Sequence, residues 1–342
     1  MVELNGKKIL VTFLMHLGDL TLTTPFIHAL RKAAPDAHIT MLVDEKLKDV
    51  VLFNPYFDEC VTIDKKGRDN SIWSLWACSR HLSKLDFDVL INLHPNERCS
   101  FIDAMTSVKL RTGTTHKIFK WFWDVFTPLD RSMHAADMYL DVLQQLGVQD
   151  LSNNGLEIFP GEEHFLEAEL FWQEQNITDQ DKLIGFNIGS AVPTKRWPPE
   201  RFAEVADIFA AKGYKTVFFG GPMDEEMVAE ATGDMQTRPI IATGHFAIGG
   251  LAAAMRRCCL IITNDSGPMH VAISQKVPIV AMYGPSNPKL YGPYTKDAVI
   301  VTAQPPCQGC ADGMKHSCDD LQCMSRMTVE QVVAAAEKML EK

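Results

Sequence analysis

The chain has 342 residues, of which 46% are hydrophobic and 22% charged, a composition typical of folded globular proteins and not of disordered or fibrous ones. Its formal net charge of −10 argues against nucleic acid as a partner, because such a surface repels a polyanion. No apolar run approaches the roughly 20 residues that span a bilayer, so we expect a cytoplasmic protein without a transmembrane segment.

The first half of the chain alternates short apolar strands with amphipathic helices. The predicted strands cover residues 8–13, 37–43 and 87–93, and the predicted helices cover 24–32 and 137–146. The stretch from 149 to 159 is rich in Asn, Asp and Gly and carries little periodicity. At this length two domains are expected, so we place a domain boundary close to residue 160.

The same alternation restarts after the boundary. The predicted strands are 183–188, 215–219, 259–263 and 278–283, and the predicted helices are 162–175, 199–212, 224–232, 247–255, 269–274 and 329–342. Strands that alternate with helices of this length build parallel sheets from βαβ units. The sequence therefore predicts an α/β protein with two Rossmann-like domains, 1–160 and 161–325, and a C-terminal segment, 326–342, whose helix can pack back on the N-terminal domain.

Open parallel sheets bind ligands at the carboxyl ends of their strands, so the turns after strands are candidate sites. The first such turn holds Gly18 and Asp19. A glycine allows a sharp turn, and a carboxylate there can accept a proton from an incoming hydroxyl group. Aspartate is also a common helix cap, and the spacing alone favours that structural role.

Two further turns carry polar groups after strands of the second half. Ser190 and Lys195 follow the strand at 183–188 and together suit a phosphate, although a solvated loop accounts for them equally well. Asp224 follows Gly220 and Gly221 and can hold ribose hydroxyls, as carboxylates do in other doubly wound nucleotide sites. A charged first helical turn stabilised by the helix dipole is the alternative.

The fourth turn is the most informative and runs from Asn264 through Asp265, Ser266, Gly267 and Pro268 to Met269 and His270. A buried strand ends here and a helix begins. Free backbone amides and the positive end of that helix favour a pyrophosphate group. His270 falls in the first helical turn, where it can add a hydrogen bond or a positive charge, or simply pack in the core.

Taken in order, these turns resemble those of the ADP-heptose:lipopolysaccharide heptosyltransferases, glycosyltransferase family 9. The matching motifs are Gly18-Asp19 with Thr24-Pro25, Lys195-Arg196-Trp197-Pro198, Gly220-Gly221-Pro222, Asn264 through His270, and Tyr283-Gly284-Pro285. The resemblance implies a GT-B fold, with two Rossmann-like domains and an active site in the interdomain cleft. It also implies inverting transfer of heptose from ADP-L-glycero-D-manno-heptose to the lipopolysaccharide inner core, in the cytoplasm or at the inner face of the cytoplasmic membrane.

The resemblance assigns roles residue by residue. Asp19 matches the catalytic base and Gly18 its turn, while Asp265 matches an aspartate near the sugar. Lys195 and Ser190 match residues at the diphosphate, Asp224 the carboxylate at the ribose, Phe246 the apolar residue against adenine, and Ser266, Gly267 and Pro268 the turn around the phosphates. Gly18 and His270, which belong to the matching motifs, are also predicted to bind substrate. Two departures are that Ala191 replaces a hydroxyl residue of some members and that Asp224 replaces a glutamate. Lys195 and the helix after Ser266 can stabilise the leaving diphosphate, so no catalytic metal is required.

Four cysteines gather near the C-terminus, at Cys307, Cys310, Cys318 and Cys323. Four thiols can bind a structural zinc ion tetrahedrally. Reduced or paired thiols are the alternative, since the second pair is more widely spaced than in usual zinc knuckles.

A basic and aromatic stretch stands out in so acidic a chain. It interleaves cations with aromatic residues: Lys109, Arg111, His116, Lys117 and Lys120 with Phe119, Trp121, Phe122 and Trp123. Such a stretch can meet the phosphates and lipid of an acceptor at a membrane surface. A partly buried helix with a solvated charged face is the alternative. Arg98 is a separate candidate for the acceptor side.

Other functions remain to be weighed against this one. A relative could transfer another nucleotide sugar or modify a protein acceptor, and a non-catalytic protein could bind a nucleotide sugar without turnover. A dinucleotide-dependent oxidoreductase predicts a Gly-x-Gly-x-x-Gly turn after a strand, and the sequence contains none.

Overall fold

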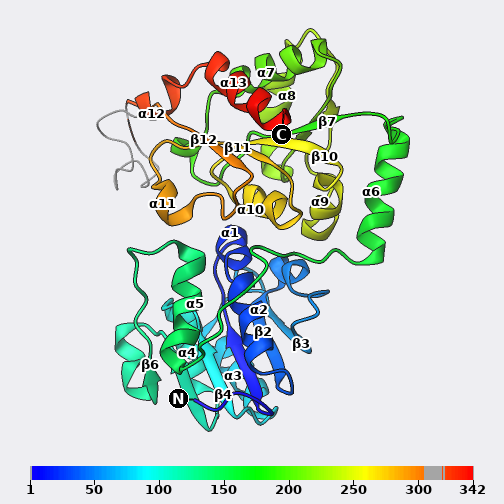
Figure 1. Ribbon diagram of the computed structural model, residues 1–342. Helices are drawn as coiled ribbons and strands as arrows, with labels where there is room; N and C mark the ends of the chain where they lie inside the picture. The colour runs from blue at the N-terminus through cyan, green and yellow to red at the C-terminus, as the bar shows by residue number, and fades with distance from the viewer. Residues whose placement is uncertain (1, 304–317, 319, 342) are drawn as a thin grey trace. The chain divides into compact units, whose positions relative to one another are not determined.

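Figure 1 shows the computed structural model of the chain, which describes residues 2–303, 318 and 320–341. The chain folds into two compact units, Met1–Phe159 and Pro160–Lys342. Each unit is built on a six-stranded sheet in which every recorded strand pair is parallel. The predicted α/β architecture with two parallel sheets is thus confirmed.

The first unit has the strand order β3-β2-β1-β4-β5-β6. Helix α2 packs against α5, and α3 packs against α4. Helix α5 ends where predicted, at Gly147, whose φ of 104° is the left-handed conformation that glycine adopts without strain. The elements of this unit are β1 (Lys8–Thr12), α1 (Leu17–Thr21), α2 (Thr24–Ala33), β2 (His38–Asp44), η1 (Glu45–Val50), β3 (Glu59–Ile63), α3 (Ile72–Ser83), β4 (Val89–Asn92), α4 (Glu97–Met105), β5 (Leu110–Gly113), η2 (Lys117–Phe122), β6 (Val125–Phe126) and α5 (Ala135–Leu146), where η marks a 3-10 helix.

The second unit repeats this topology with the order β12-β11-β10-β7-β8-β9. Its central strands consist mostly of apolar residues and are buried at every position except Lys215 and Cys259, as expected of strands covered on both faces. The elements are α6 (Glu162–Glu174), β7 (Leu183–Asn187), η3 (Pro193–Lys195), α7 (Pro199–Ala211), β8 (Lys215–Phe219), η4 (Pro222–Asp224), α8 (Glu225–Gly233), β9 (Ile240–Ile241), α9 (Ile248–Met255), β10 (Cys258–Asn264), α10 (Gly267–Ser274), β11 (Ile279–Met282), α11 (Pro288–Tyr291), β12 (Ala298–Val301), α12 (Gln322–Ser325) and α13 (Val329–Leu340).

The C-terminal helix α13 belongs to the second unit. It packs on β10, β11, β12 and α7, and Val332 and Ala336 on its inner face are fully buried in that unit's core. The indole of Trp197 donates a hydrogen bond to the carbonyl of Met327, just before the helix, at 3.0 Å. The apolar face of α13 thus completes the core of the second unit, and packing of residues 326–342 on the N-terminal domain stays a prediction.

The basic and aromatic stretch does not form the partly buried helix that was the alternative to a membrane-facing surface. Residues Leu110–Gly113 are strand β5, and Lys117–Phe122 form the 3-10 helix η2, which buries none of its residues. Within the described residues, no helix combines the length and the apolar character that crossing a membrane demands.

Candidate active site

In each sheet the strand order reverses once, between β1 and β4 in the first unit and between β7 and β10 in the second. Connections leave such neighbouring strands in opposite directions, which opens a crevice at their carboxyl ends where α/β proteins bind ligands. Asp19 follows β1, Ser190 and Lys195 follow β7, and Asp265 follows β10. Four predicted site residues therefore lie at the switch points of their own sheets.

Asp19 occupies the first turn of the short helix α1 and does not cap it. The N-cap is His16, and the cap makes no side-chain hydrogen bond. The Asp19 side chain is 29% exposed, and its Oδ2 lies 3.6 Å from Nδ1 of His16. The Asp19 carboxylate is thus partly exposed at the carboxyl edge of the sheet, where it can accept a proton.

His94 is a neighbour of Asp19 that the sequence did not identify as functional. It follows β4, the strand that pairs with β1, and its ring lies edge-on to Phe13 with centroids 6.1 Å apart. Burial lowers the pKa of His94; the negative charge of Asp19 opposes that shift, while Arg131 and His16 add to it. The lowered pKa favours a neutral imidazole beside Asp19 at neutral pH.

A buried carboxyl group lies beneath this edge of the first sheet. Asp103 on α4 is fully buried and accepts hydrogen bonds from the Thr12 hydroxyl at 2.9 Å and from the Asn92 side-chain amide. The Asn92 Oδ1 in turn accepts the backbone N–H of His94 at 2.7 Å. Burial raises the pKa of Asp103 to about 7, against the opposing hydrogen bonds from Thr12 and Asn92 and the charge of Arg111. A carboxyl group that titrates near neutrality thus supports the backbone of His94.

In the second unit the central feature is an ion pair between two sequence-predicted residues. Lys195 Nζ lies 2.6 Å from Asp265 Oδ2, with side-chain exposures of 14% and 7%. The Ser286 hydroxyl donates to the same carboxylate oxygen, and the Ser190 hydroxyl reaches the Asp265 carbonyl at 3.4 Å. Burial, followed by the Asp265 charge, raises the pKa of Tyr283 well above its usual range. The structure therefore joins Ser190, Lys195 and Asp265 in one polar cluster.

Two buried asparagines hold the loops of this cluster together. Asn264 is fully buried; its Oδ1 accepts the Trp197 backbone N–H at 3.0 Å, and its Nδ2 donates to the Ile188 carbonyl at 2.7 Å. Asn187 donates from Nδ2 to the Ser266 hydroxyl at 2.8 Å. Because a buried amide left without partners is costly, these bonds fix the β7 loop against the end of β10. Asn187 was not singled out from the sequence, where it reads as one more strand residue.

Helix α10 begins two residues earlier than predicted, at Gly267, with Ser266 as its N-cap and Pro268 at N2. Proline is well suited to this first turn, since it needs no intrahelical N–H partner there. The positive end of the helix dipole therefore lies beside the Lys195–Asp265 pair. His270 is almost fully buried, with 4% exposure.

Asp224, in the turn after β8, contacts the turn after β7. Its Oδ2 accepts the Gly221 backbone N–H at 2.9 Å, and a Cβ added to Gly189 would lie only 2.4 to 2.6 Å from the Asp224 carboxylate group. Glycine at position 189 thus allows this carboxylate to lie directly against the loop that carries Ser190. The close approach is a reason for Gly189 that the sequence motif did not reveal.

Phe246 lies among aromatic rings between α6 and α9. Its ring centroid is 5.0 Å from that of Phe171 and 4.7 Å from that of His245. Its contacts are thus with other aromatic rings, and its role toward a nucleotide base stays a prediction.

Two of the four cysteines proposed as zinc ligands belong to the described residues. Cys318 is exposed and Cys323 is buried, while Cys307 and Cys310 lie outside the described residues. In the described part of the chain, no group of three or more His, Cys, Asp or Glu side chains is arranged to hold a metal ion.

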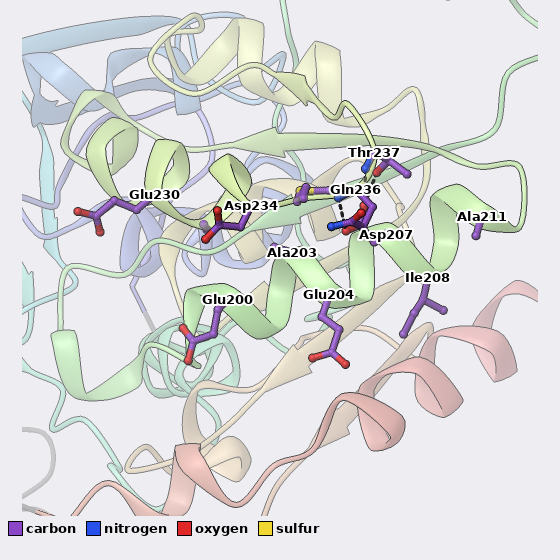
Figure 2. Close-up of a pocket in the computed structure, with 12 residues that line it drawn as sticks. Glu200, Ala203, Glu204, Asp207, Ile208, Ala211, Glu230, Asp234, Gln236 and Thr237 are labelled. Carbon is purple, nitrogen blue, oxygen red and sulfur yellow. Dashed lines mark hydrogen bonds between the residues drawn. The ribbon is translucent and has the colours of Figure 1, made fainter.

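A pocket of about 600 Å³ lies elsewhere, between α7 and α8 (Figure 2). Figure 2 shows carboxylates of Glu200, Glu204, Asp207, Glu230 and Asp234 around it. No lysine or arginine lines this pocket, and no predicted site residue does. Its acidic lining would repel a diphosphate, so we do not assign the nucleotide to it.

Comparison with known proteins decides the family. The model of glycosyltransferase family 9 (heptosyltransferase) matches residues 75–318. A crystal structure of a family 9 glycosyl transferase from Veillonella parvula shares 54% sequence identity, with 99% of each chain covered and a TM-score of 0.95. The chain belongs to glycosyltransferase family 9. It is a transferase.

Two Escherichia coli proteins extend the comparison. Lipopolysaccharide heptosyltransferase 3 of strain K12 is 25% identical over 341 residues, which cover 94% of this chain and 95% of that protein. The structure of ADP-heptose LPS heptosyltransferase II shares 21% identity, covers 98% of both chains and has a TM-score of 0.81. The shared architecture confirms that this family 9 chain has the GT-B fold.

Proposed function

We propose that this family 9 enzyme transfers heptose from ADP-L-glycero-D-manno-heptose to the inner core of lipopolysaccharide, with inversion at the anomeric carbon. The observation that carries the proposal is the Lys195–Asp265 pair beside the N-terminus of α10, at the switch point of the second sheet. Family membership and the E. coli relatives named as lipopolysaccharide heptosyltransferases support it. The name of the second E. coli neighbour supports the choice of donor.

In the proposal, residues 161–325 bind the nucleotide sugar. Lys195 and the backbone amides at the start of α10 face the diphosphate, with Ser190, Ser266, Gly267 and Pro268 shaping the phosphate turn and His270 below it. Asp224 receives the ribose hydroxyls, and Phe246 packs against adenine. Asp265 holds the Lys195 ammonium in place before the donor arrives and faces the sugar once it is bound. A preorganised cation and helix terminus need little rearrangement as charge develops on the leaving group.

Residues 1–160 form the acceptor domain, with Asp19 as general base and Gly18 in its turn. As the acceptor oxygen bonds to the anomeric carbon, its proton passes to the Asp19 carboxylate. The bond between the anomeric carbon and the diphosphate oxygen breaks, and ADP leaves with that electron pair. One displacement of this kind inverts the configuration, so it needs one base and a stabilised leaving group. Lys195 and α10 supply that stabilisation, and the proposal routes no step through a metal ion.

The proposed place of action is the cytoplasm, at the inner face of the cytoplasmic membrane, where a lipid-linked core acceptor is reached without a transmembrane segment. Arg98 on α4 is less available to that acceptor than the sequence suggested. Its guanidinium donates to the Lys65 carbonyl and to the Asn70 side chain, which indicates that it organises the neighbouring loop.

Release of ADP from ADP-heptose in the presence of a heptose-deficient core acceptor tests the function. We expect Asp19→Asn to lower kcat by roughly 10²- to 10⁴-fold, the usual contribution of a general base, and to leave donor affinity unchanged. Asp36→Asn, which alters an exposed carboxylate of the same unit, is the matched control. Equal rates for wild type and Asp19→Asn would show that Asp19 is not the base. Turnover with a different nucleotide sugar or a protein acceptor, but not with this pair, would overturn the substrate assignment.

A further inference from the structure

An unusual group of exposed aromatic side chains lies on the first unit. Trp73, Trp76 and Trp121 are 76%, 50% and 95% exposed, whereas the other three tryptophans of the chain, at 123, 172 and 197, are at most 9% exposed. Ile72, Ile118 and Phe122 are also exposed, by 55%, 65% and 46%. Large apolar side chains gathered in this way mark an interaction surface.

These residues come from two segments that the fold brings to one edge. Ile72, Trp73 and Trp76 lie in the first turns of α3, and the rest lie in η2. Helix α4 joins the two segments: Arg98 in its first turn donates to Asn70, just before α3. The Ser100 hydroxyl accepts the backbone N–H of His116, just before η2, at 2.9 Å.

A second contact holds η2 against α4, since the rings of Phe101 and Phe119 meet edge to face with centroids 6.3 Å apart. Because α3, α4 and η2 follow β3, β4 and β5, their beginnings lie at the carboxyl edge of the first sheet. Asp19, which follows β1, lies at the same edge. We call the surface formed by Ile72, Trp73, Trp76, Ile118, Trp121 and Phe122 the tryptophan face.

Positive charge accompanies the tryptophan face. Four Lys or Arg residues and no acidic residue lie between Ala104 and Trp123. Lys109 pairs with Asp88 and Arg111 donates to backbone carbonyls, which leaves Lys117 and Lys120 as the cations of the face. Lys117 and Lys120 are both exposed, and no ion pair is recorded for either within the described residues. Lys120 Nζ instead lies 4.7 Å from the ring centroid of Phe126. In a chain of net charge −10, this is a local cationic surface with aromatic residues around it.

We propose that the tryptophan face docks the enzyme on a bilayer that carries anionic headgroups. Tryptophan favours the interface between headgroups and acyl chains, and lysines beside it gain energy from anionic lipid. A second copy of the chain is the poorer occupant, because a symmetric contact would place Lys117 and Lys120 against their own counterparts. The inference rests on the proposed function in one respect, the use of the docking: it would hold the Asp19 edge of the first sheet at the membrane surface that carries a lipid-linked acceptor.

Sedimentation of the full-length protein with extruded vesicles tests the docking without any acceptor. One set of vesicles contains phosphatidylcholine alone, and the other adds phosphatidylglycerol. We expect binding to the anionic vesicles that weakens as salt is raised, and much weaker binding to the neutral ones. Lys117→Gln with Lys120→Gln should lower partitioning into anionic vesicles by about tenfold or more, and Trp73→Ser with Trp121→Ser should lower it at every salt concentration.

Matched control variants distinguish binding through the tryptophan face from a general effect of removing apolar or charged side chains. Leu166→Ser with Leu170→Ser removes exposed apolar residues from α6, and Lys296→Gln with Lys338→Gln removes exposed charges from the second unit; neither should alter binding. Melting temperatures establish that each variant folds, and the lysine variant tests the proposal even if the tryptophan variant does not fold. The proposal would be overturned if the wild-type protein bound neither kind of vesicle, or if the face variants bound vesicles as well as the wild type does. It would also be overturned if the protein bound no vesicles but self-associated, and the tryptophan substitutions abolished that self-association.

Failure here is distinct from failure of the proposed function. Vesicle binding is measured without ADP-heptose or acceptor, whereas wild-type turnover on a delipidated core acceptor is measured without vesicles. Turnover without vesicle binding would overturn only the docking surface, and vesicle binding without turnover would overturn only the proposed donor and acceptor.

Discussion

Lys195 Nζ lies 2.6 Å from Asp265 Oδ2, and the two side chains are only 14% and 7% exposed. They stand 70 residues apart in the chain, after two strands that are neighbours in the second sheet. A buried pair of this kind is held by geometry and further hydrogen bonds, here that of Ser286, more than by Coulomb attraction alone.

Substitution of Lys195 should therefore have two separable effects. We expect Lys195→Met to weaken ADP binding by roughly ten- to a hundredfold, the value of one or two hydrogen bonds to a charged group, measured by titration calorimetry. It should also lower the melting temperature, because Asp265 is left buried without its cation. In Lys195→Met with Asp265→Asn the melting temperature should recover in part while the affinity for ADP stays low. Unchanged ADP affinity in the single variant would remove Lys195 from the diphosphate site.

Gly189 should be required for the conformation of Asp224. A Cβ at position 189 would come within 2.4 to 2.6 Å of the Asp224 carboxylate, so Gly189→Ala must push that side chain away. If Asp224 binds ribose hydroxyls, the variant should lose most of the preference for ADP over 2′-deoxy-ADP, as should Asp224→Ala. Gly233→Ala is the control, since no atom lies within 4 Å of a Cβ there. Calorimetry with both nucleotides decides the matter, and an undiminished preference in Gly189→Ala would contradict the assignment.

His94 should influence the acidic side of the pH–rate profile. Its pKa is lowered by burial, against the attraction of Asp19, so the ring is neutral at pH 7 and becomes cationic below its usual pKa of about 6.5. A positive charge on His94 would oppose the arrival of a further proton beside it, and so would slow proton transfer from the acceptor.

The wild-type kcat should accordingly fall as the pH drops through the His94 pKa, and His94→Gln should flatten that fall while ADP affinity stays the same. His81→Gln, an exposed histidine of α3, should retain the wild-type profile. The same acidic limb in His94→Gln and wild type would exclude this influence of His94.

Asp103 should make stability depend on pH. Its folded pKa of about 7 is above the unfolded value of 3.8, so the folded state binds more protons between these values and this group's contribution is lost as the pH rises through that window. Asp103→Asn removes the titration. Relative to wild type, the variant should gain up to ~3 kcal/mol in free energy of unfolding between pH 5 and pH 8. Urea unfolding at both pH values measures the difference, and a difference that stays constant with pH would show that Asp103 does not titrate in this range.

Much of the fold could be predicted because its central strands are buried on both faces. Strands such as β7 and β8 are mostly apolar and end in turns of small and polar residues, and the prediction for these strands is confirmed. Helix α4 was missed for the opposite reason: beside apolar Cys99 and Ile102 it buries Ser100 and Asp103, so no clean apolar face is visible in its sequence. Helix α3 exposes Trp73 and Trp76, which obscures its periodicity in the same way.

The sequence by itself determined the α/β class, the two sheets and the family, because apolar periodicity reports local burial and the turn motifs keep their order along the chain. Only the tertiary structure decided which turns meet: that Asn264 fastens the loop of Trp197, that His94 stands beside Asp19, and that Lys195 pairs with Asp265. The physical reason is that these contacts depend on which strands are neighbours and on the exact reach of each side chain. Parallel pairing of β7 with β10, set by the packing of helices on both faces, brings distant turns to one sheet edge, and no local pattern of residues contains that information.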